Sequence, residues 1–441
     1  MEQPFFENQT SEHQAPIYFL DLTVENVRCF GERQTLDLSD GNGQPARWTI
    51  ILGDNGVGKT TLLKCLVALR PKKNSTIPEG YDWKYLSTFR FARTLDQDFL
   101  VKTSKFYTGA FNLNKGLIID GYYFNNHTNK GLPASKTKNL MIYAYGASRR
   151  MGSGSLEKSY QPDSAANLFE EEIGLINAVE WLLQAIFASQ NSQGDSQIYF
   201  ENRYQKVKNM LIELLPDVAD IRAKPITKTQ SNPTIEFKTG YGWVSMRDLS
   251  LGYQTLIAWM VDLAHRLFER YSDCQNPLEQ PAIVLVDEID LHLHPKWQRT
   301  VITHLTGIFK QTQFIVTAHS PLIVQSAPID ANIVLLKRQG DQVIIHNNQD
   351  EQLIKGWRID QVLTSDLFDV PNARPSLYDQ YLKRQQELFQ KPQLTDADKS
   401  ELEQIGKKLD ELPIVAQTKE DSEAMTILRK AADILKTNYK L

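Results

Sequence analysis

Residues 53–60 read GDNGVGKT, and this stretch decides the fold. It matches the phosphate-binding pattern G-x-x-x-x-G-K-[ST], in which glycines let consecutive backbone N–H groups point at a phosphate. Lys59 is expected to reach the β- and γ-phosphates of a nucleotide, and the Thr60 hydroxyl is expected to hold Mg²⁺. The residues expected to contact the nucleotide in this loop are Gly53, Asn55, Gly56, Gly58, Lys59, Thr60 and Thr61.

The flanks of the loop supply the context that phosphate binding requires. Residues 48–52 (WTIIL) form a short apolar stretch of β type, and residues 61–69 (TLLKCLVAL) have the apolar density of a buried helix. The loop is therefore expected between a strand and a helix N-terminus, where backbone N–H groups favour an anion. Taken alone, the glycines are also compatible with a tight structural turn.

A second half of the site is expected far along the chain. Residues 281–290 (PAIVLVDEID) contain consecutive apolar residues, which indicate a strand buried on both faces, followed by two carboxylates. Asp287, at the end of such a strand beside the phosphate loop, is expected to hold Mg²⁺. Glu288 is expected to polarise the attacking water, as a general base or as an orienting acceptor. Without the phosphate loop, both would read as solvated acids at the end of a core strand.

Another apolar strand, residues 313–320 (QFIVTAHS), ends at His319. A strand beside the Asp287 strand would bring this imidazole to the γ-phosphate. We interpret His319 as a phosphate sensor that orients the water; the alternative is an ordinary polar residue at a strand end.

His292 and His294 form an HxH pair, which invites a zinc interpretation. No cysteine or third histidine lies nearby in the sequence to complete a tetrahedral site. We instead expect residues 290–293 to form a loop crossing a subunit interface, with Pro295 starting the next helix.

Residues 249–254 read LSLGYQ and precede a helix expected over residues 253–267. Ser250 and Gly252 at a helix start offer a hydroxyl, exposed N–H groups and a positive helix end, which together suit a γ-phosphate. Considered singly, the two residues would indicate an ordinary N-cap and nothing more.

The motif order resembles that of the ATP-binding-cassette ATPases: phosphate loop, signature helix, DE strand, crossing loop and strand-end histidine. The resemblance implies an α/β fold, an ABC-type ATPase head with a mixed central sheet and an antiparallel β subdomain. It also implies ATP and Mg²⁺ as cofactors. In that family the signature of one subunit closes on the ATP of another, so we expect a homodimer with composite ATP sites or a higher oligomer.

The interval between the two halves discriminates within this family. Transporter cassettes have a shorter interval, and structural-maintenance ATPases insert a long coiled coil. Here residues 165–189 and 203–215 read as two helices, and neither sustains the heptads of a coiled coil. The insert is therefore predicted to be a short helical lid, similar in size to that of RecF and the overcoming-lysogenization ATPases.

Two finer matches, YAYGASRR at residues 143–150 and DEIDLHLHPKWQR at residues 287–299, resemble the ATPase subunits of Septu-type anti-phage systems. The first lies where cassette proteins place the loop that links the γ-phosphate to the insert. It has no obvious glutamine, so Ser148, Arg149 and Arg150 are expected to take over part of that role.

This resemblance implies a slowly hydrolysing regulatory ATPase that controls a separate HNH-type nuclease subunit in antiviral defence. The alternative is a RecF-like, ATP-dependent DNA-binding clamp in DNA repair. A nuclease site within the chain itself is not expected, because its tail shows neither a Toprim-like acidic cluster nor a His-Asn-His arrangement.

Near the start of the chain, residues 18–30 (YFLDLTVENVRCF) read as a first strand and its turn, which in this group approaches the adenine and α-phosphate. Arg28 is the candidate contact, and a solvated surface arginine is the alternative. Residues 1–15 are polar, without the segments of a signal peptide, and are expected to be a flexible leader.

Composition favours a cytoplasmic enzyme without a membrane segment. No apolar run approaches the length needed to cross a bilayer, and the three cysteines are scattered, as for free thiols in a reducing compartment. The net charge of −4 means that any DNA contact must be local. Two basic regions are candidates, with solvated helix faces as the alternative: Arg70, Lys72 and Lys73, and Lys206, Lys208, Arg222, Lys224 and Lys228.

The predicted organisation has five parts. The two halves of the ATPase head span residues 16–160 and 233–350, and the lid spans residues 161–232. Residues 351–441 are expected to form a helical tail for partner binding or oligomerisation, with helices at 376–390, 395–411 and 419–437. The flexible leader, residues 1–15, is the fifth part.

Overall fold

The chain divides into two compact units, Met1–Phe368 and Asp369–Leu441. The predicted leader, the third tail helix and the basic residues Lys72, Lys73 and Lys228 lie outside the residues that the structure describes. The structure, a computed structural model, describes residues 16–70, 93, 98–108, 117–120, 123–125, 129–130, 140–152, 163–224, 233–348, 358–365, 367–368, 378–391 and 394–410.

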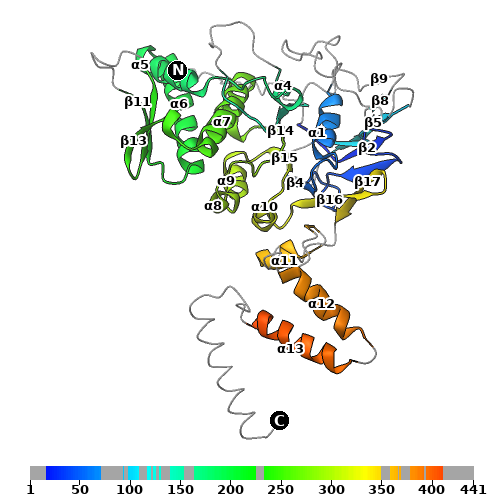
Figure 1. Ribbon diagram of the computed structural model, residues 1–441. Helices are drawn as coiled ribbons and strands as arrows, with labels where there is room; N and C mark the ends of the chain where they lie inside the picture. The colour runs from blue at the N-terminus through cyan, green and yellow to red at the C-terminus, as the bar shows by residue number, and fades with distance from the viewer. Residues whose placement is uncertain are drawn as a thin grey trace. The chain divides into compact units, whose positions relative to one another are not determined.

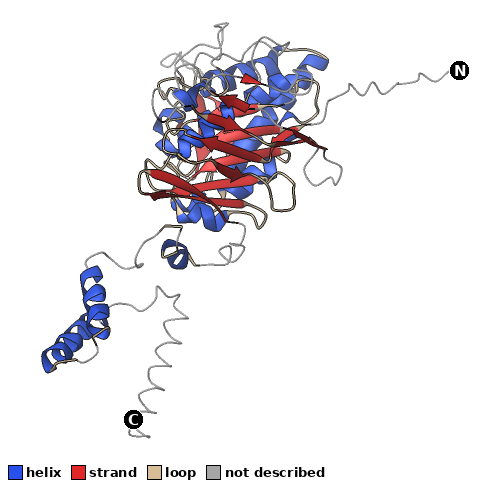
Figure 2. Ribbon diagram, turned by 90° about the vertical axis from the view of Figure 1, so that its right-hand side faces the viewer, coloured by secondary structure: helices blue, strands red, loops and turns tan. Residues whose placement is uncertain are grey.

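A six-stranded mixed sheet forms the centre of the first unit, in the order β10-β14-β15-β4-β16-β17 (Figures 1 and 2). Neighbouring strands are parallel except for β17, which runs antiparallel to β16. Runs of Val, Ile and Leu are typical of strands covered on both faces, and every residue of β14 is buried. The bounds are β4 (Trp48–Gly53), β10 (Ile142–Tyr145), β14 (Ala282–Val286), β15 (Thr312–Thr317), β16 (Asn332–Gln339) and β17 (Gln342–Asn348).

The two faces of this sheet build two separate cores. Along β4, Ile50 joins one core and Ile51 joins the other, because successive side chains of a strand point to opposite faces. The Ile51 face packs on α1 (Lys59–Ala68), and the Ile50 face packs on α7 (Leu251–Arg270). The two helices lie on either side of β14 and β15 (Figure 1). The short helices on the α7 side are α8 (Pro295–Gln298), α9 (Val301–Ile308) and α10 (Pro321–Ser326).

Antiparallel strands cover the α1 side, and the predicted α/β fold with a mixed sheet and an antiparallel β subdomain is confirmed. One sheet has the order β3-β2-β5-β8-β9 and another the order β1-β6-β7. Their bounds are β1 (Ile17–Phe19), β2 (Asp21–Glu25), β3 (Gln34–Asp37), β5 (Leu100–Lys102), β6 (Lys105–Thr108), β7 (Leu117–Asp120), β8 (Tyr123–Asn125) and β9 (Asn129–Lys130).

The lid holds the helices α5 (Ala178–Asn191) and α6 (Asp195–Leu214), with bounds that differ from prediction. The expected helix over residues 165–189 breaks after the short α4 (Ala166–Phe169), because Gly174 packs directly on Gly152 and Asn177 then caps α5. A three-stranded sheet of β11 (Asp220–Ala223), β12 (Ile235–Thr239) and β13 (Gly242–Ser245) completes the lid and crosses the expected boundary at residue 232.

After α11 (Ile359–Leu363), the second unit holds α12 (Asp379–Phe389) and α13 (Asp396–Asp410), close to two of the expected tail helices. Arg384 joins the helices by donating to both carboxylate oxygens of Glu401 at 2.9 and 3.0 Å. Thr395 and Asp398 exchange backbone and side-chain hydrogen bonds at the start of α13 and so form a reciprocal capping box.

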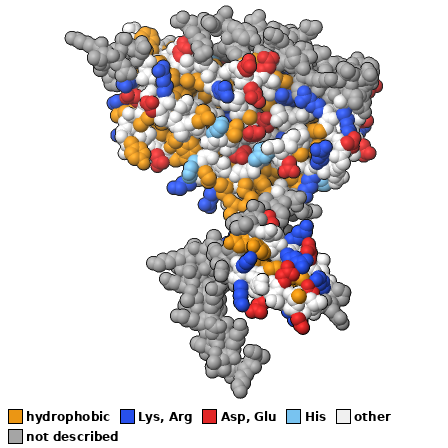
Figure 3. Space-filling model, in the orientation of Figure 1, with side chains coloured by type: hydrophobic (Ala, Val, Ile, Leu, Met, Phe, Trp, Pro, Cys, Tyr) orange, Lys and Arg blue, Asp and Glu red, His pale blue; other side chains and the backbone are white. Residues whose placement is uncertain are grey.

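The basic residues named as DNA contacts are largely committed to acids. Arg70 was expected in a surface patch, but it is only 3% exposed and donates to both carboxylate oxygens of Asp163, which corrects that interpretation. In the lid, Lys208 pairs with Asp220, and Arg222 and Lys224 pair with Glu236. On the face shown in Figure 3, basic and acidic side chains are interspersed. Of the first predicted patch only Arg70 is described, and in the second patch three of the four described basic residues are paired with acids.

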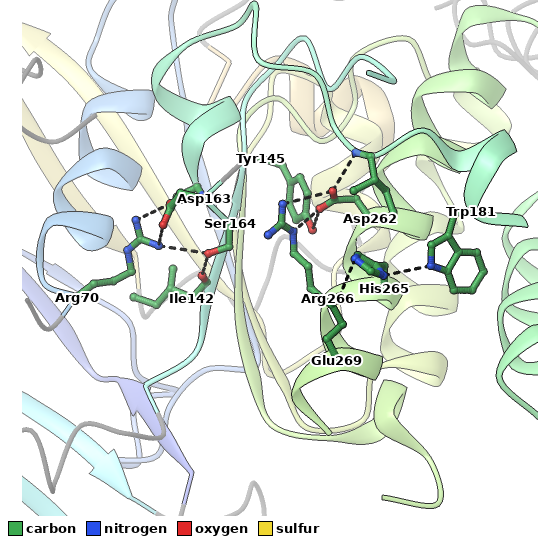
Figure 4. A network of polar contacts seen from close by, with 12 residues as sticks. Arg70, Ile142, Tyr145, Asp163, Ser164, Trp181, Asp262, His265, Arg266 and Glu269 are labelled. Carbon is green, nitrogen blue, oxygen red and sulfur yellow. Dashed lines mark hydrogen bonds and ion pairs between the residues drawn. The ribbon is translucent and has the colours of Figure 1, made fainter. Parts of the chain in front are cut away.

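The Arg70–Asp163 pair ties the end of α1 to β10, because Ser164 accepts from Arg70 and donates to the Ile142 carbonyl (Figure 4). Replacing Asp163 with Ala leaves a buried guanidinium without its carboxylate, so D163A is expected to lose about 3–5 kcal/mol of unfolding free energy. Urea denaturation measures this loss. The control D273A removes an exposed carboxylate and should shift the unfolding free energy by no more than about 0.5 kcal/mol. An equal effect of both variants would contradict the role of the pair.

Candidate functional site

The phosphate loop connects β4 to α1, as expected, and its glycines adopt conformations that other residues rarely reach. Gly53 and Gly58 have φ values of +141° and +91°. A Cβ atom on Gly53 would lie 2.6 Å from the Leu336 carbonyl, and one on Gly58 would meet the Cys29 thiol. Gly58 is also the N-cap of α1 and provides no side-chain hydrogen bond. The first N–H groups of α1 therefore keep the orientation that favours an anion.

Lys59 folds back onto the loop that precedes it. Its Nζ donates to the carbonyls of Gly53 at 2.8 Å and Asp54 at 2.9 Å. The residue is 6% exposed, and this burial lowers the pKa of the ammonium, while the nearby carboxylates of Asp287 and Glu288 oppose the shift. The ammonium is thus held at the mouth of the loop by neutral acceptors that a phosphate can replace.

Thr60 and Asp287 meet directly, although 227 positions separate them. The Thr60 hydroxyl donates to Asp287 Oδ2 at 2.6 Å, and the Thr317 hydroxyl donates to Oδ1 at 2.6 Å. The Glu288 N–H in turn donates to Thr317 Oγ1 at 2.7 Å. Sequence reasoning missed Thr317, whose only signal is its place at the end of the strand before His319. Hydroxyl and carboxylate oxygens are ligands that suit Mg²⁺, so the donor set fits this ion.

Glu288 adopts an unusual backbone conformation beside Asp287. Its φ of +50° lies in the left-handed region, which costs free energy for a residue with a Cβ. Its carboxylate accepts no hydrogen bond from any residue that the structure describes, whereas its backbone is fixed on both sides. The side chain is half-buried and stays available for another acceptor or donor.

Arg149, which was expected to take over part of the role of the missing glutamine, makes hydrogen bonds to the backbone of this turn. It is 2% exposed, with φ +34°, and donates to the carbonyls of Gly146 at 3.2 Å, Glu288 at 2.9 Å and Asp287. Burial lowers the pKa of its guanidinium to about 10. Ser148, which donates to the Glu171 carbonyl, and the exposed Arg150 are the members of the linking loop that reach the surface.

His319 follows β15, which lies between the strands that carry Asp287 and the phosphate loop. The carboxyl ends of parallel strands meet at one edge of a sheet, so this position places His319 between the two motifs. The His319 N–H donates to both carboxylate oxygens of Asp290 at 3.2 Å, which joins the strand end to the crossing loop.

The signature residues begin α7, which packs on the opposite face of the sheet from α1. Ser250 is the exposed N-cap of α7 and makes no capping hydrogen bond with its side chain. Gly252 is buried, and a Cβ there would meet the His292 carbonyl of the crossing loop, so packing alone accounts for this glycine. Within the described ranges, the hydrogen bonds of Lys59 and Thr60 reach neither signature residue.

Arg28 lies in the turn after β2, with φ +50° and an exposed side chain. The next two residues, Cys29 and Phe30, pack against Gly58, so this turn covers the start of α1. Burial lowers the pKa of Lys64 on α1, and the positive charge of the nearby Arg28 guanidinium lowers it further. The turn is thus placed beside the phosphate loop.

The two histidines of the HxH pair differ in their surroundings. His294 caps α8 by accepting from the Lys296 N–H at 3.3 Å, and α8 begins at Pro295 as predicted. His292 is exposed, with φ +64°. Among the described residues, no three His, Cys, Asp or Glu side chains gather as a metal site, and no helix is long and apolar enough to cross a membrane.

Known proteins are similar to this chain in sequence. A Septu protein PtuA of Bacillus mycoides (strain KBAB4) is 25% identical over 391 residues, which cover 87% of this chain and 49% of that protein. A Retron Vc95 probable ATPase of Vibrio cholerae serotype O1 biovar El Tor is 37% identical over 155 residues, covering 35% of this chain and 29% of that protein. The solved SmcHead bound to the C-winged helix domain of ScpA is 16% identical with a TM-score of 0.47, covering 77% of this chain and 99% of that chain.

The chain spans about half the length, or less, of these two curated relatives. The similarity to the Septu protein over most of the chain confirms the resemblance predicted from its two finer motifs. A family model described as "AAA domain, putative AbiEii toxin, Type IV TA system" matches residues 49–325, from the start of β4 to the end of α10. This match includes the phosphate loop, the lid, α7 and the strands that precede Asp287 and His319, and the chain belongs to that AAA-domain family.

Proposed function

We propose that this chain binds ATP with Mg²⁺ and hydrolyses it slowly. The observation that carries the proposal is the contact between Thr60 and Asp287, which brings the two motifs of the predicted magnesium site within one hydrogen bond. Because the Thr60 hydroxyl donates its hydrogen bond to Asp287, the lone pairs of the hydroxyl oxygen remain available to a cation. When bound, Mg²⁺ would neutralise charge on the β- and γ-phosphates.

Each remaining group of the site has a separate task. Lys59 exchanges its two carbonyl acceptors for phosphate oxygens, and Asn55, Gly56 and Thr61 complete the phosphate contacts. Glu288 orients or deprotonates the attacking water, and His319 contacts the γ-phosphate from the neighbouring strand. Arg28 approaches the adenine and α-phosphate from the turn above α1.

We propose further that the active form is a head-to-tail homodimer. Ser250 is an exposed N-cap whose side chain makes no capping hydrogen bond, and the start of α7 packs beside the crossing loop. An exposed helix N-terminus of this kind suits the γ-phosphate of another subunit. Asp287 and Glu288 belong to the chain that supplies the phosphate loop. Each ATP is then held between one chain's Lys59 and its partner's signature.

The biological role proposed is that of a regulatory subunit in antiviral defence, controlling a separate HNH-type nuclease. Similarity to a Septu protein and to a retron probable ATPase supports this role. The second unit, with its two-helix hairpin outside the match to the AAA-domain family, supplies a segment for binding the nuclease. The alternative, a RecF-like clamp on DNA, receives little support from lid cations that are already paired with acids.

Replacing Glu288 with Gln keeps the size of the side chain and removes its basicity. E288Q is expected to bind ATP with unchanged affinity, to lose at least about 100-fold in kcat, and to accumulate as an ATP-bound dimer. Phosphate release and light scattering measure the two effects. The control E201Q, on the exposed face of α6, should behave as the wild type. Normal turnover by E288Q would show that the catalytic assignment is wrong.

Mixing two inactive variants tests the composite site. K59A lacks the phosphate-loop lysine, and S250R blocks the exposed signature serine without touching the core. Each variant alone should be inactive. An equal mixture should regain roughly a quarter of wild-type hydrolysis, because half of the dimers contain one intact site out of two. No recovery, with heterodimers demonstrated by two affinity tags, would contradict the head-to-tail arrangement.

Coexpression with an HNH nuclease encoded beside this chain tests the proposed partner. A stable complex on size exclusion, with DNA cleavage that E288Q alters, is the expected result. ATP-dependent binding of duplex ends by the isolated chain, without any such complex, would favour the DNA clamp instead.

A further inference from the structure

The signature helix α7 and the catalytic turn are joined by two sets of buried contacts within one chain. α7 begins at Ser250, and its middle carries Trp259 and Asp262, which are 2% and 1% exposed. Both side chains contact the segment that ends β10 and leads into the linking loop. That segment in turn contacts the backbone of Asp287 and Glu288.

The first connection runs through Arg149. Its guanidinium lies over the Trp259 ring, with Cζ 5.7 Å from the ring centroid, and its terminal nitrogens donate to the carbonyls of Asp287 and Glu288. Its third acceptor is the Gly146 carbonyl. Nε has no acceptor in the part of the chain that the structure describes. The hydrogen bonds of this side chain are therefore concentrated on the catalytic turn and the strand end beside it.

The second connection runs through Asp262 (Figure 4). Its Oδ2 accepts from the Tyr145 hydroxyl at 3.0 Å and from Arg266 Nε at 2.7 Å, and its Oδ1 accepts from the Ile176 N–H at 3.2 Å. The Tyr145 carbonyl accepts from the Asp287 N–H at 2.9 Å. Tyr145 also meets the Trp259 ring edge-on, with centroids 5.9 Å apart. Both connections converge on the same two-residue turn.

Burial of the Arg149 guanidinium costs more free energy than an apolar side chain of the same volume would at this position. Burying a guanidinium loses its hydration, and its hydrogen-bond partners here are backbone carbonyls rather than carboxylates. Arg149 and Glu288 both have positive φ, at +34° and +50°. Backbone strain of this kind persists where surrounding contacts impose it, and it gathers at functional sites. An apolar side chain would fill the same volume at lower cost but would not hold the turn.

We propose that Arg149 is a positioning residue that sets the Glu288 carboxylate for attack on ATP and makes this setting depend on α7. The proposal rests on the hydrolytic function proposed above. Contact of Ser250 with the nucleotide of a second copy fixes the N-terminal end of α7, and Trp259 and Asp262 carry any displacement of that helix to the turn. Arg149 acts through the backbone of Asp287 and Glu288 and does not touch the nucleotide.

The variants R149M and R149K test the proposal. Met keeps the aliphatic stem against Trp259 and removes every donor, so kcat is expected to fall about 100-fold while KM for ATP changes less than about threefold. Lys keeps one cationic donor but lacks the planar fork that spans two carbonyls, so R149K is expected to lose about tenfold. R149M should still form the ATP-bound dimer, because only the chemical step is impaired.

A double variant separates positioning of Glu288 from general damage. If Arg149 works through Glu288, adding R149M to E288Q should lower the residual rate by less than about threefold, because E288Q has already removed the carboxylate that Arg149 positions. Two independent effects would multiply. A further fall of about 100-fold in the double variant would therefore overturn the proposal.

The matched control is R47M. Arg47 is half-buried and, like Arg149, donates to two backbone carbonyls, those of Thr306 at 2.6 Å and Phe309 at 2.7 Å, and it precedes β4 at the opposite end of that strand from the phosphate loop. R47M should lower the melting temperature without changing kcat. Should R149M fail to fold, R149K decides, and wild-type kcat in R149K would overturn the proposal. Absence of ATP hydrolysis in the wild type would instead contradict the proposed function.

Discussion

The carboxylate of Asp287 is the point on which the rest of the structure depends. It accepts from Thr60 on α1 and from Thr317 on β15, and it follows β14, so one side chain ties together three elements of the sheet edge. These contacts form only when β14, β15 and β4 are adjacent and parallel, with their carboxyl ends aligned. Three parallel strands need crossover connections, and the helices that provide them build the cores on both faces.

The separation of those cores has a consequence for function. α1 carries the phosphate loop on one face of the sheet, and α7 carries the signature on the other. The phosphate loop and the signature of one chain therefore lie on different faces of its own sheet, and a second copy is the proposed means of joining them. In the same arrangement α7 is connected to the backbone of Asp287 through two side chains of the neighbouring segment. Arg149 lies over Trp259 of α7, and Tyr145 donates to Asp262 of α7.

The insert between the two halves is compact for a physical reason. α5 and α6 pack on each other and on α7 through buried residues such as Trp181 and Leu211, so their apolar faces are used inside the lid. A coiled coil needs an apolar seam that continues beyond the head, and neither helix has one. The three-stranded sheet then closes the lid, with Ile235 and Phe237 facing its core and charged pairs on the opposite face.

The sequence by itself determined the features that depend on local residues. Glycine spacing predicted the phosphate loop, because positive φ at Gly53 and Gly58 is a property of the residue type, and apolar runs predicted the buried strands. The α/β class followed from the resemblance in motif order. Only the tertiary structure decided where the arginines point. Arg149 was expected to act in the linking loop and Arg70 in a basic patch, yet both are buried by partners that lie 138 and 93 positions away in the chain. The environment of a long charged side chain is set by residues distant in sequence, and local pattern carries no information about them.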